Sequence, residues 1–491
     1  MKELSKATRR EFMKKAGALS VMQAATPLAA SLSLMNNAAA QTTSVSGYKA
    51  LVCVFMYGAN DHYGTVVPYR QDLYNAYSSI RGHGDINGDY QGIALLREKL
   101  RPLTPSGKPV LDHALHPAMD SMQGLFNKGR AGIVMNVGPL IVPTNAELFK
   151  NRFNNHLPLP PNLLSHNNQQ AYWQTSLKGE EAPTGWGGRM ADLFLSSNKH
   201  ANLTCVSVTG DALFLSGHQT LSTKMSTAGV ATINPLNHSL KTYGNDVAAL
   251  DMIKTLSNSP DNHMMTAQYA KVMSRSLSTY NTVVGHLGTA ELTNADLAYM
   301  PSAHGTESTP LAEQLEMVAR MIQKGIAMDL KRQVFMVGVG GFDLHDNLVS
   351  QHPKLLKMVS DACAEFDAAM VRLEGAKKIP MNSVTTFTAS DFGRTLTSNG
   401  DGSDHGWGSH HFVMGGAVNG GQFYGTAPLV AADHSQSIGH GILIPTTSLE
   451  QLFVPVARWF GVAEGEDMAT VFPNAKNFST SLSGLFKPSS A

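Results

Sequence analysis

The sequence feature that most constrains the fold is an alternation between short apolar runs and amphipathic helical patterns. The apolar runs are closed by glycine or polar residues and comprise residues 50–58, 131–138, 203–210, 333–341 and 383–390. Runs this short, and β-branched in part, are typical of strands buried on both faces. Patterns with one apolar helical face occupy residues 116–129, 311–330, 353–375 and 448–461. This alternation predicts an α/β fold with a mostly parallel central sheet flanked by helices.

The composition excludes some classes of protein. The 491 residues carry a formal net charge of +1, so no overall basic field favours nucleic-acid binding. Only three cysteines are present, and Cys53, Cys205 and Cys363 all lie inside apolar strand or helix patterns. We expect them to be small buried hydrophobic residues and not a disulfide framework.

The N-terminus has the pattern of an export signal. Arg9 and Arg10 form a twin arginine shortly before Phe12, and a moderately apolar, alanine-rich region ends at Ala40. A basic region, an apolar region and a small-residue cleavage site together indicate a secretory signal, and the arginine pair indicates the twin-arginine (Tat) pathway. A first amphipathic helix or a membrane anchor is the alternative, but a proline and several polar residues interrupt the apolar part. We therefore predict a signal peptide over residues 1–40, recognised by the Tat machinery, and a periplasmic or secreted protein.

The mature chain, residues 41–491, is predicted to be one α/β domain. Residues 211–310 differ from the rest, because they are rich in Ser, Thr, Asn and Met and show only weak helical pieces. We interpret them as an insertion that caps the sheet. No other apolar run reaches the roughly 18 residues of a membrane-spanning helix, so no stable span is expected in the mature chain.

Three of the predicted strands each end beside an aspartate. Asp61 follows the first strand, Asp343 and His345 follow the fourth, and Asp391 follows the fifth. In a parallel sheet the carboxyl ends of strands meet at one edge, where functional residues gather. Carboxylate and imidazole ligands together suit Zn²⁺, Mn²⁺ or Fe²⁺. The alternative for Asp61 or Asp343 alone is a helix cap or an Asx turn.

The stretch SDFGRTLTSNGDGSDHGWGSHHF, residues 390–412, gathers further candidate ligands. It includes His405 and the adjacent pair His410 and His411. Neighbouring residues of an extended strand point in opposite directions, so at most one of this pair is expected to bind an ion. The other would pack or touch substrate. The motifs HExxH, CxxC and GxSxG are absent, which argues against zincin, redox and α/β-hydrolase chemistry.

Several segments carry a family resemblance. The stretches CVFMYGANDHYGTVVPY, NLLSHNNQQAYWQT, GGFDLHDN, SDFGRT and SDHGWGSHHF, together with the Tat-type N-terminus, resemble the exported family known as domain of unknown function 1501. That family is similar to the alkaline phosphatase and sulfatase superfamily. The resemblance implies an alkaline-phosphatase-like sheet with two metal ions at the strand ends, which hold a Ser, Thr or modified-Cys nucleophile.

The resemblance also implies roles for individual residues. Ser165 stands as the nucleophile with His166 beside it, and Thr65 is another candidate hydroxyl. Arg394 would hold a non-bridging oxygen of the substrate. The implied ligands of one or two divalent ions, Zn²⁺ or Mn²⁺, are Asp61, Asp343, His345, Asp391 and either His405 or His410.

One position departs from the superfamily pattern. Phe392 stands where the superfamily has a histidine, so one metal site lacks a ligand. Two hypotheses follow. The chain is an exported metal-dependent hydrolase of anionic phosphate or sulfate esters, or it is a degenerate binding or assembly protein of the cell envelope that holds at most one structural ion.

Overall fold

The computed structural model describes residues 47–82, 92–105, 110–177, 183–230, 255, 264–287, 292–306, 308–479 and 481–488. The predicted signal peptide lies outside these residues. So do residues 231–254 and 256–263 of the predicted insertion.

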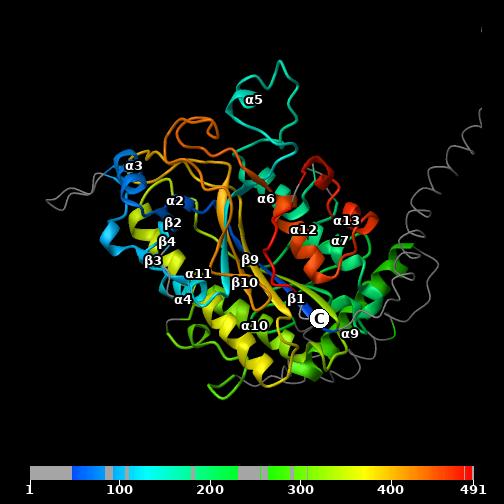
Figure 1. Ribbon diagram of the computed structural model, residues 1–491. Helices are drawn as coiled ribbons and strands as arrows, with labels where there is room; N and C mark the ends of the chain where they lie inside the picture. The colour runs from blue at the N-terminus through cyan, green and yellow to red at the C-terminus, as the bar shows by residue number, and fades with distance from the viewer. Residues whose placement is uncertain are drawn as a thin grey trace, which may run out of the picture.

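The described part of the chain forms a nine-stranded sheet in the middle of the molecule (Figure 1). The strand order is β11-β5-β10-β9-β1-β8-β6-β7, and β12 pairs with β5. The strands are β1 (Lys49–Met56), β5 (Ala131–Gly138), β6 (Cys205–Ser207), β7 (Thr223–Lys224), β8 (Arg332–Val339), β9 (Val384–Ser390), β10 (Ser409–Gly415), β11 (Phe423–Gly425) and β12 (Thr447–Ser448). All five predicted apolar runs form strands of this sheet, although the third run contributes only the short β6.

The sheet is mostly parallel, as predicted. β1 lies between β8 and β9 and is parallel to both. β10 is the exception, because it runs antiparallel to β9 on one side and to β5 on the other. The carboxyl ends of β1, β8 and β9 therefore meet at one edge, and the chain leaving β9 returns to that edge before it enters β10.

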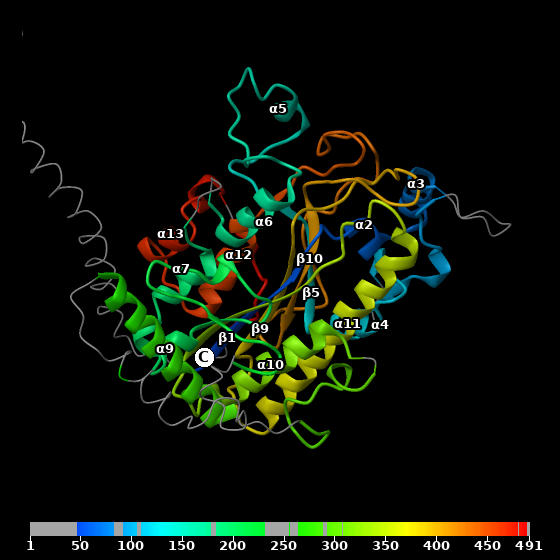
Figure 2. The same cartoon turned by 180° about the vertical axis from the view of Figure 1, so that it is seen from behind.

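Helices cover both faces of the sheet (Figures 1 and 2). Val52 and Val54 of β1 point into one core, with helices α4 (Asp120–Asn127), α10 (Pro310–Gly325) and α11 (Leu348–Gly375). The alternate residues Cys53 and Phe55 point into the other, with α6 (His166–Thr175), α7 (Trp186–Asp192) and α12 (Leu449–Phe460). This two-sided burial explains why the strands read as continuous apolar runs.

One helix begins earlier than the sequence indicates. The helical pattern predicted over residues 353–375 starts at Pro353, but α11 begins at Leu348 and contains this proline. Asp401 accounts for the earlier start, because its side chain accepts a hydrogen bond from the backbone N–H of Asn347 and its carbonyl accepts one from that of Leu348. Groups at a helix N-terminus lack partners within the helix, and here a distant loop supplies them.

The remaining elements lie around this core. A second, antiparallel sheet has the order β2-β4-β3. The elements are β2 (Val66–Pro68), β3 (Arg101–Leu103), β4 (Val110–Leu115), α2 (His62–Thr65), α3 (Gln71–Arg81), α5 (Ala146–Lys150), α9 (Met264–Leu287) and α13 (Glu466–Val471). None of the described helices combines the length and apolarity needed to cross a membrane. Cys53, Cys205 and Cys363 are buried and unpaired, as predicted.

Candidate metal centre

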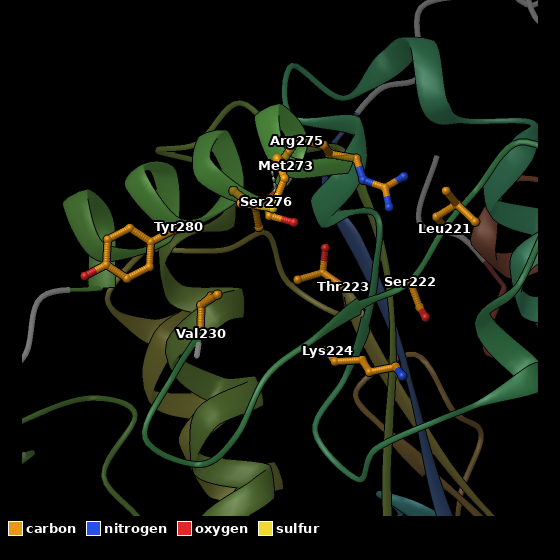
Figure 3. Close-up of a pocket in the computed structure, with 10 residues that line it drawn as sticks. Leu221, Ser222, Thr223, Lys224, Val230, Met273, Arg275, Ser276 and Tyr280 are labelled. Carbon is orange, nitrogen blue, oxygen red and sulfur yellow. Dashed lines mark hydrogen bonds between the residues drawn. The ribbon is translucent and has the colours of Figure 1, made fainter. Parts of the chain in front are cut away.

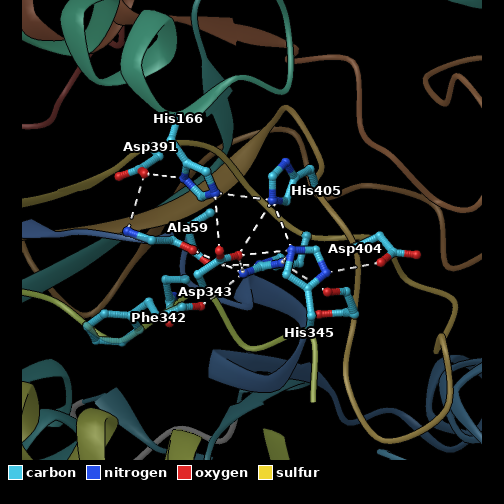
Figure 4. A network of polar contacts seen from close by, with 12 residues as sticks. Ala59, His166, Phe342, Asp343, His345, Asp391, Asp404 and His405 are labelled. Atoms are coloured by element: carbon cyan, nitrogen blue, oxygen red, sulfur yellow. Dashed lines mark hydrogen bonds and ion pairs between the residues drawn. The ribbon is translucent and has the colours of Figure 1, made fainter.

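Four side chains converge at the carboxyl edge of the sheet, and we call them the His/Asp cluster: His166, Asp343, His345 and His405 (Figure 4). Asp343 and His345 lie in the loop that follows β8, and His166 is the first residue of α6. His405 reaches the same place because its backbone forms an antiparallel bridge with Arg394, which follows β9. Three separate parts of the chain therefore supply the cluster.

Glycines allow these segments to approach one another closely. A Cβ on Gly402 would lie 2.3 Å from backbone atoms of His345, and a Cβ on Gly393 would lie 2.0 Å from the carbonyl oxygen of Gly408. Neither contact is possible for a residue with a side chain. Gly393 and Gly402 are thus required by the close packing of the loop against the site.

The ligand atoms of the cluster lie close together. His405 Nε2 is 3.1 Å from His166 Nε2 and 3.0 Å from His345 Nε2. The carboxylate of Asp343 lies 3.4 Å from His166 Nε2, 3.1 Å from His345 Nε2 and 3.5 Å from His405 Nε2. His166, Asp343 and His405 each offer one atom, and these three atoms all lie within 4.8 Å of one another.

Each histidine of the cluster has its other ring nitrogen beside an acceptor. His166 Nδ1 lies 2.6 Å from Asp391 Oδ2, and His405 Nδ1 lies 2.8 Å from the Leu164 carbonyl oxygen. His345 Nδ1 lies 3.2 Å from Asp404 Oδ1. Because these partners only accept, the hydrogen of each neutral imidazole belongs on Nδ1, and the lone pair on Nε2 faces the cluster.

This donor set fits a divalent ion of the zinc class. Ligands bound tetrahedrally at about 2.0–2.1 Å lie about 3.3 Å apart, close to the separations among His166, Asp343 and His405. His345 Nε2 approaches Asp343 and His405, and it also lies 3.4 Å from Arg394 Nη1. Adjacent Nε2 lone pairs repel unless a cation or proton lies between them. Second nitrogens held by carboxylates or carbonyls are the usual outer shell of metal-bound histidine. The side chains are 27–45% exposed, so the site opens to solvent.

The surroundings of His405 and His166 shift the pKa values of the two imidazoles in opposite directions. Burial lowers the pKa of His405 below its ordinary value, which favours the neutral, ligand-competent form. The hydrogen bond to Asp391 raises the pKa of His166 and outweighs the opposing effect of burial. Burial would raise the pKa of Asp343, but the adjacent Arg394 guanidinium overcomes it and holds this pKa below its usual range.

Arg394 supports the cluster from beneath. Its side chain is 0% exposed and forms an ion pair with Asp343. It also donates hydrogen bonds to backbone carbonyl oxygens of residues 58, 59, 342 and 403, at 2.9–3.2 Å. The N–H groups of Arg394 therefore bind groups of the protein itself. They connect the loops at the strand ends and hold the carboxylate of Asp343 in place.

Three residues of the implied ligand set lie elsewhere, and one of them, Asp391, contacts His166 Nδ1. Both carboxylate oxygens of Asp61 contact the buried guanidinium of Arg81, at 2.8 and 3.2 Å. His410 is 2% exposed, and its Nδ1 accepts a hydrogen bond from the Asn136 backbone N–H. The structure therefore brings His405, and not His410, to the cluster. His411 points to the opposite side of β10, where its ring lies 4.7 Å from that of Trp173.

The candidate hydroxyls differ in their surroundings. Ser165 is the N-cap residue of α6, directly before His166, and its side chain makes no capping hydrogen bond. Thr65 is buried, and its hydroxyl donates to the Asp61 carbonyl oxygen at 2.7 Å. Ser165 thus has the more available hydroxyl of the two.

A family model for a protein of unknown function, DUF1501, matches residues 48–473. The chain belongs to the DUF1501 family. The match covers the sheet, the cluster and both helical layers, which agrees with the resemblance carried by the sequence motifs. No curated protein matches the chain by sequence.

Solved structures with distant similarity to this DUF1501 protein include a sulfatase and an alkaline phosphatase. Ps i-CgsB has 9% identity over 88% of this chain and 77% of its own, with a TM-score of 0.31. A 2-O GAG sulfatase has 13% identity over 86% and 73%, with a TM-score of 0.27. Alkaline phosphatase from the Antarctic bacterium TAB5 has 9% identity over 88% and 99%, with a TM-score of 0.25.

Phe392 forms an apolar wall beside the cluster of this DUF1501 protein. Its buried ring lies 4.8 Å, centroid to centroid, from the rings of both His166 and His405. Such contacts restrict the two imidazoles to their observed orientations.

Sequence reasoning noted Asp404 in the stretch 390–412 and missed two supporting groups, Gln170 and the carbonyl of Leu164. Gln170 Nε2 donates to Asp391 Oδ2 at 2.8 Å. It lies four residues after His166, so a helical reading of SHNNQQ places both on one face of α6. No comparable signal in the sequence marks the carbonyl of Leu164.

A cavity of about 320 Å³ lies elsewhere, between β7 and α9 (Figure 3). It is lined by Thr223 and Lys224 on one side and by α9 residues such as Arg275 and Tyr280 on the other. It shares no residue with the His/Asp cluster.

Proposed function

We propose that this DUF1501 protein is an exported, metal-dependent hydrolase of phosphate or sulfate esters. One observation carries the proposal: His166 Nε2, His405 Nε2 and the Asp343 carboxylate converge, with His345 Nε2 beside the last two, while every Nδ1 lies beside an acceptor. Partial exposure favours a catalytic ion over a structural one, because catalytic ions keep an open position for water or substrate.

A divalent ion bound here, Zn²⁺ or Mn²⁺, would polarise an ester oxygen and lower the pKa of a nearby hydroxyl. His166, His405, His345 and Asp343 would hold it. Ser165 is proposed as the nucleophile, since it precedes His166 and its hydroxyl does not cap α6. Its oxygen would form the bond to phosphorus or sulfur as the bond to the leaving alcohol breaks, and water would then release the acid.

The test measures metal content and ester hydrolysis together. The purified chain should contain zinc or manganese by elemental analysis and should hydrolyse p-nitrophenyl phosphate or p-nitrophenyl sulfate. His405→Ala should lose most of the metal and the activity. His218→Ala is the matched control, because His218 is exposed and lies outside the cluster. A chain that takes up neither metal after incubation with both ions would sink the proposal.

A second function is favoured by Phe392. Its apolar ring fills space beside two ligand histidines, as expected of a protein that binds an ion without turnover. In that case the chain would act as a binding or assembly protein of the cell envelope. Metal bound at the cluster with no hydrolysis of either ester would select this function.

A further inference from the structure

Asp391 lies behind His166 relative to the His/Asp cluster. Figure 4 shows Asp391 on one side of the His166 ring and His405 on the other. Asp391 Oδ2 is 2.6 Å from Nδ1, whereas Nε2 is the atom that faces His405 and Asp343. The two nitrogens of an imidazole point away from each other. A carboxylate oxygen on Nδ1 therefore cannot also bind an ion held by Nε2.

Three donors fix this carboxylate oxygen. Besides His166, Asp391 Oδ2 accepts hydrogen bonds from Gln170 Nε2 at 2.8 Å and from the Gly58 backbone N–H at 3.2 Å. Asp391 is 0% exposed, so its charge has no solvent to compensate it. Oxygen Oδ1 is also buried and has no hydrogen-bond partner within the described ranges.

Gln170 ties this carboxylate to the helix that carries His166. The two residues are one turn apart on α6, and their side chains contact the same oxygen. Loss of the Gln170 donor would leave only the Gly58 N–H and His166 on this oxygen, so the acceptor of His166 Nδ1 would be held less firmly. The imidazole could then place its hydrogen on Nε2, which would block metal binding.

We propose that Asp391 and Gln170 are positioning residues, which hold His166 in the Nδ1–H tautomer so that Nε2 presents its lone pair to the ion. This inference rests on the proposed metal centre, but it assigns Asp391 a role outside the ligand set. Hydrogen bonds connect Gln170 to Asp391 and Asp391 to His166. Loss of the first bond should weaken binding of the ion without changing the number of ligands.

The experiment measures Zn²⁺ binding by calorimetry and the His166 tautomer by ¹⁵N NMR of histidine-labelled, metal-free protein. Gln170→Met keeps the size of the side chain and removes its donor. We expect about tenfold weaker Zn²⁺ binding at unchanged stoichiometry, since outer-shell changes typically cost 10- to 100-fold. His166 should gain Nε2–H tautomer. Asn167→Leu, at an exposed position of the same helix, is the control and should change neither.

A Co²⁺-loaded Asp391→Asn variant tests whether Oδ1 binds the ion. The visible spectrum should keep the wild-type band intensity, because no ligand is lost. A change in coordination would overturn the positioning role, as would wild-type affinity and tautomer in Gln170→Met. The NMR measurement needs no metal and no ester hydrolysis, so its outcome is separate from that of the proposed function.

Discussion

At the scale of single residues, Arg394 connects the site to the fold. One guanidinium joins the loops after β1 and β8 to the loop after β9, and it also pairs with Asp343. Its five N–H groups in a planar fork allow these contacts at once. Removing it would leave buried carbonyl groups without donors, and such groups are costly.

Arg394→Met should therefore lower the free energy of unfolding by about 3 kcal/mol or more, because a buried charged donor and its partners are lost together. Urea unfolding at neutral pH measures this. Arg458→Met is the comparison: Arg458 pairs with Glu464 at the surface, where such pairs contribute at most about 1 kcal/mol. Equal effects of the two substitutions would contradict the role given to Arg394.

The position of a residue at the end of a predicted strand indicated some residues of the cluster. It did not indicate which partner each of the other strand-end residues contacts. Asp343 and His345 are brought together because parallel strands deliver their loops to one edge. Asp61 is delivered to the same edge, but Arg81, from a neighbouring helix, neutralises it. The residues that surround Asp61 in the sequence do not indicate that Arg81 will form an ion pair with it. The positioning role proposed for Asp391 depends in the same way on the direction of the His166 ring.

At the scale of elements, two helices begin with serine and differ in how it is used. Ser448 caps α12: its side chain accepts from the Gln451 N–H, and the Gln451 side chain accepts from the Ser448 N–H. Ser165 begins α6 without any such bond. A serine at a helix start that does not cap is available for another task.

Ser448→Ala should therefore cost about 1 kcal/mol of stability and leave ester hydrolysis unchanged. Ser165→Ala should do the reverse, with little change in stability and loss of hydrolysis. Thermal unfolding and a p-nitrophenyl ester assay on both variants distinguish the two roles. A marked loss of stability in Ser165→Ala would show that its hydroxyl serves the helix.

The strand order shows what apolar patterns can and cannot predict. Buried parallel strands are visible as apolar runs, and all five predicted runs join the sheet. β10 was not predicted as one of them, because it opens with Ser409, His410 and His411, which looked like ligands. Both histidines are instead buried between packed layers, and only the fold supplies their partners.

At the scale of the whole molecule, buried neutral histidines make stability depend on pH. Burial lowers the pKa of His113 to about 4 and that of His116 to about 3. In the unfolded chain both should titrate near 6.5. Between these values the unfolded state binds more protons than the folded state, so stability falls as pH falls.

We expect the stabilisation to be fully present above pH ~6.5 and to be lost at up to ~1.4 kcal/mol per pH unit for each such histidine below it. Urea unfolding at pH 7, 6 and 5 with a chelator present measures this slope without the metal centre. His116→Gln should make the slope shallower. An unchanged slope in that variant would count against His116 as a source.

We propose that the N-terminal arginine pair directs export of the whole chain. Replacing both Arg9 and Arg10 with lysine should retain the protein in the cytoplasm, because the pathway reads the pair itself and not its charge. Cell fractionation and the size of the processed chain report the result. Lys6→Gln, which removes one charge and keeps the pair, should still be exported.

The antiparallel β10 also has a consequence for how the protein folds. β9 and β10 are close in the chain, pairing Phe387 with Val413, whereas β1 pairs Lys49 with Arg332, across more than half of the 491 residues. Contacts between nearby residues form faster than those that must close a long loop. The hairpin-like unit that carries Asp391 and His405 should therefore form early, and Asp343 should join it only when the central strands pair. Binding of the proposed ion would then report the last step of folding.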